Sequence, residues 1–191
     1  MSVEPQRKWT AEEYLAFERQ QPLRHEYQDG EILAMGGASR IHNRISWNIT
    51  VALDPQLSRL GCEGFASDMR VRLASSERYT YPDIVVVCGE PEFEDAELDT
   101  LLNPTLILEI LSPSTEDHDR GRKLFDYRSI PSVQSILLVA QDRVHVEQLA
   151  CQGDGSWVLT EADSLDAVVP LHGIDAQLPL TDVYRRVPRL S

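Results

Sequence analysis

The sequence predicts one α/β domain with a central mixed sheet flanked by helices, in the order helix, three strands, helix, strand, with extra elements at both ends. Two continuous apolar runs, Asp83–Cys88 and Leu106–Leu111, have the length and composition of strands that are covered on both faces. A third run of this kind, Ile136–Ala140, follows a segment with a helical pattern. Strands separated by helices are typical of α/β folds. The 191 residues suffice for a single domain, 1–191, with its own core.

Before these strands, the sequence predicts a short helix and a hairpin. Thr10 and Glu13 have the spacing of a capping box, which predicts a helix over Thr10–Arg19. The hairpin joins His25–Tyr27 to Glu31–Met35, and the turn dipeptide Asp29–Gly30 connects them. This hairpin is an addition before the central sheet.

A longer helix is predicted to begin near Arg40. It is indicated by an apolar stripe that repeats every four residues, formed by Ile41, Ile45, Ile49 and Leu53. Because proline lacks an N–H donor and clashes with the preceding turn, Pro55 is expected to end or kink this helix near Asp54.

Between this helix and the first buried strand, an alternating pattern predicts a half-exposed strand, in which Met69, Val71 and Leu73 alternate with Arg70 and Arg72. The acidic run Glu90–Asp99 is interpreted as a solvated loop or exposed helical turn without chemistry.

The C-terminal half adds further elements around the last buried strand. Ser114 and Asp117 can cap a helix that ends near Ser129, before Pro131. A hairpin is predicted from Val144 and Val146 to Trp157–Thr160, across Gly153–Gly155. A short helix is expected near Leu180–Arg186.

Composition limits the classes of protein that fit. The 18 Lys and Arg residues against 31 Asp and Glu give a formal charge of −13, which argues against tight binding of nucleic acid by this chain alone. The three cysteines, Cys62, Cys88 and Cys151, form no CxxC pair, so neither a disulfide framework nor a zinc cluster is indicated. Free cysteines of this kind suggest a reducing compartment. No signal-peptide pattern or membrane-length apolar run is present, so we expect a cytoplasmic protein without membrane contact.

Glu109 is the most informative residue because it interrupts an apolar strand. On a strand it shares one face with Ile107 and Leu111. A buried carboxylate without a partner costs several kcal/mol, so Glu109 requires a cation, a metal ion or a proton.

A second carboxylate, Asp83, stands at the start of the other buried strand, directly after Pro82. Two carboxylates on neighbouring strands repel each other unless a divalent cation lies between them. Oxygen ligands of this kind suit Mg²⁺ or Mn²⁺. Taken singly, Asp83 could be a turn or cap residue, and Glu109 could pair with an arginine. A metal site is indicated only by the two residues together.

Several segments together resemble the Uma-type family of restriction-endonuclease-like proteins, which belongs to the PD-(D/E)XK nuclease superfamily. They are YPDIVVV, NPTLILEILSPST and DRGRKLFDYRSIPSVQSILLV, with TAEEYLAFE, HEYQDGEI, SRIHNRI and LPLTDVY. The resemblance covers nearly the whole chain. It implies a restriction-endonuclease-like core with a four-stranded mixed sheet between helices, to which this chain adds an N-terminal hairpin and C-terminal β-hairpins.

The resemblance also implies roles for individual residues. Pro82–Asp83 match the P-D element and Glu109 matches the D/E element, whereas Leu111 stands where the motif has lysine. Some superfamily members are thought to supply this lysine from the following helix, and here Lys123 is the candidate. Lys123 could instead form a surface pair with Asp119, four residues earlier.

Four further residues are weaker candidates. Glu26 could add a carboxylate to the metal site or face solvent in its hairpin. His42 could contact the site or a phosphate, or be an ordinary helix histidine. Arg120 and Arg122 could bind a phosphate or be surface charge.

The function expected from these residues is Mg²⁺-dependent hydrolysis of phosphodiester bonds in nucleic acid, with Asp83 and Glu109 as metal ligands and Lys123 as the catalytic cation. Because fold does not fix function, two alternatives stay open. One is a degenerate binding or assembly module, and the other is a metal-dependent hydrolase of a different substrate. A homodimer is expected on general grounds, and nucleic acid could be delivered by a basic partner.

Overall fold

The computed structural model describes residues 8–73, 77–112, 121 and 123–188. Its largest element is a six-stranded mixed sheet with the strand order β11–β10–β9–β8–β6–β3. The strands are β3 (Cys62–Ala66), β6 (Ile84–Cys88), β8 (Leu106–Leu111), β9 (Ser135–Ala140), β10 (Val146–Cys151) and β11 (Trp157–Ala162). Strands β8 and β9 run parallel, whereas the other neighbouring pairs of this sheet are antiparallel.

A five-stranded sheet includes the N-terminal hairpin and has the order β2–β1–β5–β4–β7. Its strands are β1 (His25–Gln28), β2 (Glu31–Ala34), β4 (Arg70–Leu73), β5 (Arg78–Thr80) and β7 (Thr100–Leu101). A separate hairpin consists of β12 (Val168–Leu171) and β13 (Ala176–Pro179). The helices are α1 (Ala11–Glu18), α2 (Arg40–Leu60), α4 (Leu124–Arg128) and α5 (Leu180–Val183).

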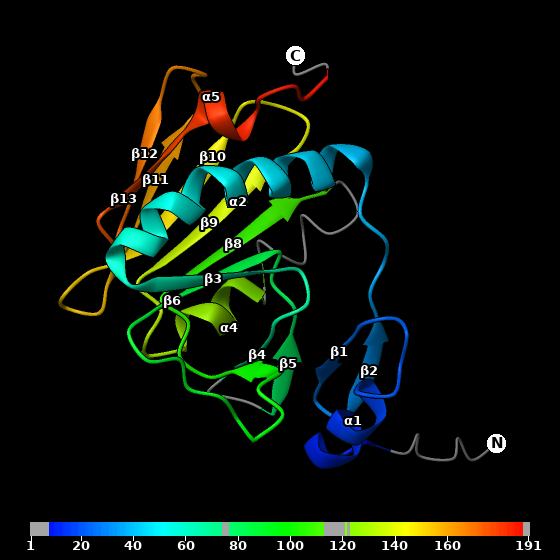
Figure 1. The fold of residues 1–191 in the computed structure, drawn as a ribbon. Helices are drawn as coiled ribbons and strands as arrows, with labels where there is room; N and C mark the ends of the chain where they lie inside the picture. The colour runs from blue at the N-terminus through cyan, green and yellow to red at the C-terminus, as the bar shows by residue number, and fades with distance from the viewer. Residues whose placement is uncertain (1–7, 74–76, 113–120, 122, 189–191) are drawn as a thin grey trace.

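Helices cover the larger sheet on opposite faces (Figure 1). On one face, the buried stripe of α2, which includes Ile45, Ile49 and Leu53, packs with inward residues of β6, β8 and β9. On the other face, Tyr127 of α4 belongs to a second core cluster with Ile107 of β8. The predicted α/β class, with a mixed sheet flanked by helices, is confirmed.

The long helix differs from the prediction at Pro55, because α2 continues through this residue to Leu60. Proline removes one backbone hydrogen bond of the helix. The helix nevertheless keeps its apolar stripe beyond this point, since Leu57 is buried in the same cluster as Leu53. Packing therefore outweighs the local cost, and α2 ends at Gly61, which has a left-handed conformation.

The predicted N-terminal elements are confirmed. Helix α1 begins with the reciprocal capping box of Thr10 and Glu13. Strands β1 and β2 are joined by Asp29 and Gly30, both with positive φ, as a type I′ turn requires. The hairpin is not isolated, because β1 also pairs with β5.

Two sequence interpretations between β4 and β7 are corrected by ion pairs. Arg70 is not on an exposed strand face: it is 2% exposed and pairs with Asp99 at 2.8 Å. The acidic run is not merely a solvated face either, since Asp95 and Asp99 both bind Arg19 of the segment after α1 at 2.8 Å. Arginine partners that are remote in sequence thus hold this loop against the N-terminal helix.

The cysteines also differ from the expectation. Cys62 of β3 and Cys88 of β6 are directly opposed in the antiparallel register and form a disulfide, and Cys151 is free. The expectation of three free thiols was wrong because the sequence does not show that β3 is the neighbour of β6. The cysteines therefore no longer indicate a reducing compartment.

The larger sheet has six strands where the family resemblance implied four, because the β10–β11 hairpin extends it beyond β9. This hairpin and β12–β13 are the predicted C-terminal β-hairpins. The proposed helix start at Ser114 and Asp117 lies outside the described residues, and α4 covers the last part of that segment. Within the part of the chain that the structure describes, no helix is long and apolar enough to cross a membrane.

Candidate active site

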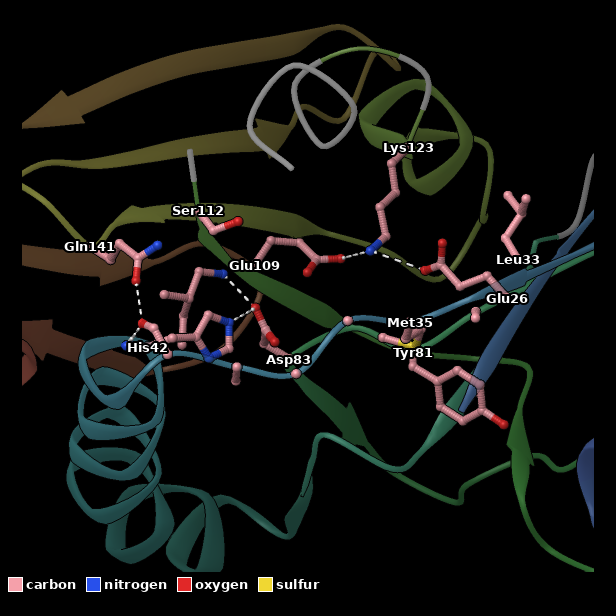
Figure 2. A pocket seen from close by; sticks show the side chains of 16 residues that line it. Glu26, Leu33, Met35, His42, Tyr81, Asp83, Glu109, Ser112, Lys123 and Gln141 are labelled. Atoms are coloured by element: carbon pink, nitrogen blue, oxygen red, sulfur yellow. Dashed lines mark hydrogen bonds and ion pairs between the residues drawn. The ribbon is translucent and has the colours of Figure 1, made fainter. Parts of the chain in front are cut away.

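One pocket lies where β6 and β8 of the larger sheet meet the N-terminal end of α2 and the β1–β2 hairpin (Figure 2). It encloses about 450 Å³. The structure brings five sequence-predicted site residues to its wall: Glu26, His42, Asp83, Glu109 and Lys123. The remaining two candidates, Arg120 and Arg122, lie outside the described residues.

Asp83 reaches the pocket because it immediately precedes β6. Strands β6 and β8 are antiparallel with Ile84 opposite Leu108, so the residue before Ile84 lies near the C-terminal end of β8. There, Asp83 Oδ2 accepts a hydrogen bond of 2.7 Å from the backbone N–H of Ile110. His42 Nε2 lies 3.1 Å from the same oxygen. These contacts fix the orientation of a carboxylate whose side chain is 21% exposed.

Glu109 is buried within β8, with 5% of its side chain exposed. Its Oε1 accepts a hydrogen bond of 2.5 Å from the Tyr127 hydroxyl and lies 2.9 Å from Lys123 Nζ. Burial, together with the neighbouring Glu109 carboxylate, raises the pKa of Tyr127 well above its ordinary value. Tyr127 therefore stays protonated and can donate. The buried carboxylate thus has a cation, one of the partners expected from the sequence, and a hydroxyl, which was not expected.

Lys123, directly before α4, is a buried residue rather than a surface residue. Its ammonium contacts two carboxylates, Glu109 at 2.9 Å and Glu26 Oε1 at 3.3 Å. The alternative of a helix-surface pair does not fit this burial, and its partner Asp119 lies outside the described residues. At the motif position, Leu111 is buried and apolar. A lysine from the following helix thus occupies the neighbourhood of the strand carboxylate.

Glu26 comes from β1 of the smaller sheet and faces the pocket rather than solvent (Figure 2). It accepts a short hydrogen bond from the Thr80 hydroxyl on β5. Through Lys123, it is connected to Glu109 of the larger sheet. The N-terminal hairpin therefore contributes to the site, which its position in the sequence alone left open.

His42 lies in the first turn of α2, which begins at the N-cap Ser39. Its ring faces Asp83, and its Nε2 lies 3.1 Å from Asp83 Oδ2. On the same side of the pocket lies Gln141, the residue directly after β9. Its Oε1 accepts a hydrogen bond of 2.8 Å from the Ser39 hydroxyl. The start of α2 is thereby linked to the residue before β6 and to the residue after β9.

The charge balance of the pocket favours a cation. Among the wall residues that the structure describes, Glu26, Asp83 and Glu109 contribute three negative charges and Lys123 one positive charge, which leaves −2 if His42 is neutral. One divalent ion would neutralise this difference, and oxygen-rich sites of this kind suit Mg²⁺ or Mn²⁺. The arrangement can hold a hard cation beside a fixed ammonium, which is a suitable environment for an anionic substrate.

The polar residues that sequence reasoning missed at the site include Tyr127, Thr80 and Gln141. Tyr127 could have been found, because it follows Lys123 by four residues and therefore lies on the same helix face. Gln141 carries a comparable signal, since it is the first polar residue after a buried strand. Thr80 carries none, because the pairing of β5 with β1 is not visible in the sequence.

Comparison with known proteins gives consistent results over nearly the whole chain. Residues 11–181 match the model of the Uma2 family, described as "Putative restriction endonuclease". Two relatives are uncharacterized proteins of Synechocystis sp. (strain ATCC 27184 / PCC 6803 / Kazusa). One is 41% identical over 152 residues, covering 80% of this chain and 86% of the relative. The other is 34% identical over 178 residues, covering 93% and 92%.

Among solved structures, the fold is similar to that of a "putative nuclease belonging to DUF820" from Anabaena variabilis ATCC 29413. The TM-score is 0.71, and the match covers 92% of this chain and 97% of the other. At 20% sequence identity this likeness establishes the shared fold.

Proposed function

This chain belongs to the Uma2 family, and from that membership we propose that it is a Mg²⁺-dependent nuclease that hydrolyses phosphodiester bonds in nucleic acid. The observation that carries the proposal is the convergence of Asp83, Glu109 and Lys123 on one pocket. Two carboxylates from neighbouring strands and a buried lysine are the groups that metal-assisted phosphodiester hydrolysis requires.

The metal ligands would be Asp83 and Glu109. Asp83 Oδ2 is held by Ile110 and His42, while no group in the described parts of the chain donates a hydrogen bond to Oδ1. This leaves one oriented oxygen facing the pocket. A divalent cation bound there would supply Lewis-acid chemistry, acidifying water and neutralising charge that develops on the phosphate.

The protein's own groups would position the reactants. Lys123 holds an ammonium beside Glu109, where it can orient a water molecule or donate to a phosphate oxygen as negative charge develops. Tyr127 fixes the Glu109 carboxylate by donating to Oε1, and His42 fixes Asp83 in the same way. Because these supporting bonds are already formed, little reorganisation is needed during the reaction.

The proposal is tested by hydrolysis of three substrates with Mg²⁺, Mn²⁺ or EDTA. They are a labelled single-stranded oligonucleotide, the corresponding duplex and a chromogenic phosphodiester. We expect metal-dependent cleavage of nucleic acid that Asp83→Asn abolishes. The matched control is Asp54→Asn, which changes an exposed carboxylate on α2 and should cleave like the parent protein.

The outcomes separate the alternative functions. Hydrolysis of the chromogenic ester without cleavage of either nucleic acid would indicate a hydrolase of another substrate class. A binding or assembly module would be indicated if none of the three substrates were hydrolysed. The protein concentration must be one at which calorimetry detects Mn²⁺ binding. Cleavage that Asp83→Asn leaves unchanged would place the reaction at a different site.

A further inference from the structure

A group of exposed cationic and aromatic residues lies on the solvent-facing side of α2. Arg40, Asn43, Arg44 and Trp47 line a shallow hollow on this helix, and we call them the α2 patch. All four are exposed, and Trp47 is 62% exposed. Their spacing of three or four residues places them on one face of the helix.

The two arginines of the α2 patch keep their charge available. Among the residues that the structure describes, no carboxylate lies within ion-pair distance of Arg40 or Arg44, and the first turn of α2 contains no acidic residue. In contrast, Arg19, Arg70 and Arg78 each pair with aspartate. In a chain of net charge −13, the two arginines are a local concentration of positive charge. The N-terminal end of the helix dipole adds to it.

Trp47 is not required by the core. The buried side of α2 contains Ile45 and Ile49, whereas Trp47 points away from them and exposes most of its surface. A solvent-facing indole beside two guanidinium groups provides a stacking surface for a planar base and two donors for phosphate. This combination is typical of surfaces that bind single-stranded nucleic acid.

The α2 patch adjoins the candidate active site along the chain. Ser39 and His42 line the pocket, while Arg40 and Asn43 line the patch in the same helical turn. Trp47 lies seven residues beyond Arg40, which corresponds to about 10 Å along the helix axis. A strand whose phosphate enters the pocket would therefore reach the patch with its neighbouring nucleotides.

From this placement we propose that the α2 patch binds an unpaired strand of nucleic acid, with a base stacked on Trp47 and phosphates held by Arg40 and Arg44. The inference rests on the proposed nuclease function and adds the substrate class. A base can stack on Trp47 only when it is not stacked within a duplex. Two arginines are also fewer than the several phosphate contacts that tight duplex binding requires.

A second copy of the chain is a less suitable occupant. In a two-fold dimer whose axis passed through the patch, the patch would meet itself, and the arginine pairs of both copies would face each other without the carboxylates that could neutralise them. A polyanion offers the opposite charge. The electrostatics therefore favour nucleic acid over self-association.

The test measures binding without catalysis. Fluorescence anisotropy in EDTA is followed with labelled single-stranded DNA, single-stranded RNA and duplex DNA. We expect both single strands to bind more tightly than the duplex, and the comparison between them shows which sugar is preferred. Trp47→Ala should weaken single-strand binding about 5- to 160-fold, the range for losing one stacked base. The control Arg59→Gln, an exposed arginine near the other end of α2, should bind like the parent protein.

Salt dependence gives a second readout. Replacing both arginines, as Arg40→Gln/Arg44→Gln, should reduce the slope of log K against log salt by about 1.4, since each lost phosphate contact on a single strand contributes about 0.7. The inference would be overturned if Trp47→Ala bound the single strand as tightly as the parent protein, or if the duplex bound more tightly than the single strands. It would also be overturned if the only effect of the substitutions were a shift from dimer to monomer.

The two proposals fail in distinguishable ways. A parent protein that binds the single strand in EDTA through Trp47 but cleaves nothing with Mg²⁺ would refute the nuclease function and retain the patch. A parent protein that cleaves, while Trp47→Ala binds as tightly as before, would refute the patch alone.

Discussion

Replacing Lys123 with methionine should destabilise the metal-free protein, because two carboxylates would lose a cation that contacts both of them. Nζ lies 2.9 Å from Glu109 and 3.3 Å from Glu26, and the side chains of Lys123 and Glu109 are 10% and 5% exposed. Removal of one partner from a buried ion pair costs about 3–5 kcal/mol. For a chain of this size, that corresponds to a fall in melting temperature of about 6–20 °C. Methionine retains the apolar stem, so the change isolates the ammonium.

A double-mutant cycle identifies the cause of this loss. Glu109→Gln removes the carboxylate charge, so Lys123→Met should cost less in that background, with a coupling energy of about 1–3 kcal/mol. Urea unfolding at pH 7.5 in EDTA measures all four proteins. The control Arg143→Met removes an exposed ion pair with Asp142 and should change the free energy of unfolding by less than about 0.5 kcal/mol. If Lys123→Met unfolds at the same urea concentration as the parent protein, Lys123 does not neutralise the site.

Three further predictions concern the supporting structure. Tyr127→Phe should lower the free energy of unfolding by about 1–3 kcal/mol, since it removes the donor to the buried Glu109 carboxylate, and urea unfolding would contradict this if the midpoint did not move. The Arg19 hydrogen bond holds the pKa of Asp99 in the folded protein well below its ordinary value. The stability that Asp99 contributes to the folded protein is therefore complete above about pH 4, the pKa in the unfolded chain, and is lost as the pH falls through the lower pKa of the folded state. Asp99→Asn should therefore be less stable at pH 7 and lose less stability between pH 5 and pH 2, whereas parallel pH curves would contradict the assignment. Reduction of the β3–β6 disulfide should cost about 3–4 kcal/mol by the chain-entropy model for cysteines 26 residues apart. A thiol titration of the denatured, unreduced protein should find one free thiol, and three would refute the bond.

The sequence was sufficient where burial and local geometry gave the same answer. The runs Ile84–Cys88 and Leu106–Leu111 are strands because their apolar side chains are covered on both faces. The charged residue within the second run was informative for the same reason, because nothing in the packing of a central strand requires Glu109. The local turn signal at Asp29–Gly30 was equally reliable.

Contacts between remote segments could not be predicted in this way. Arg70 alternates with apolar residues and looks exposed, yet it is buried because Asp99 and Tyr81 meet it from other elements. The disulfide depends on the neighbouring positions of β3 and β6, which the spacing of the cysteines does not reveal. Pro55 was wrongly expected to end the helix. The helix continues because Leu57, beyond the proline, packs against the larger sheet, and this contact is not visible in the local sequence.

The candidate site lies between these two cases. Asp83 and Glu109 could be chosen from the sequence because both occupy positions where a carboxylate is unusual. The location of Lys123 relative to Glu109 required the path of the chain between β8 and α4. Glu26 required the packing of the smaller sheet against the larger one, which no local pattern encodes.

The central claim is that Asp83 and Glu109 share a divalent cation, and a crystal soaked in Mn²⁺ tests it most directly. Anomalous scattering from manganese identifies the ion independently of the protein. We expect one strong peak in the pocket, within direct coordination distance, about 2.0–2.3 Å, of one oxygen from each carboxylate. The peak should be lost in Asp83→Asn. A peak elsewhere with this pocket empty, or an unchanged peak in Asp83→Asn, would contradict it.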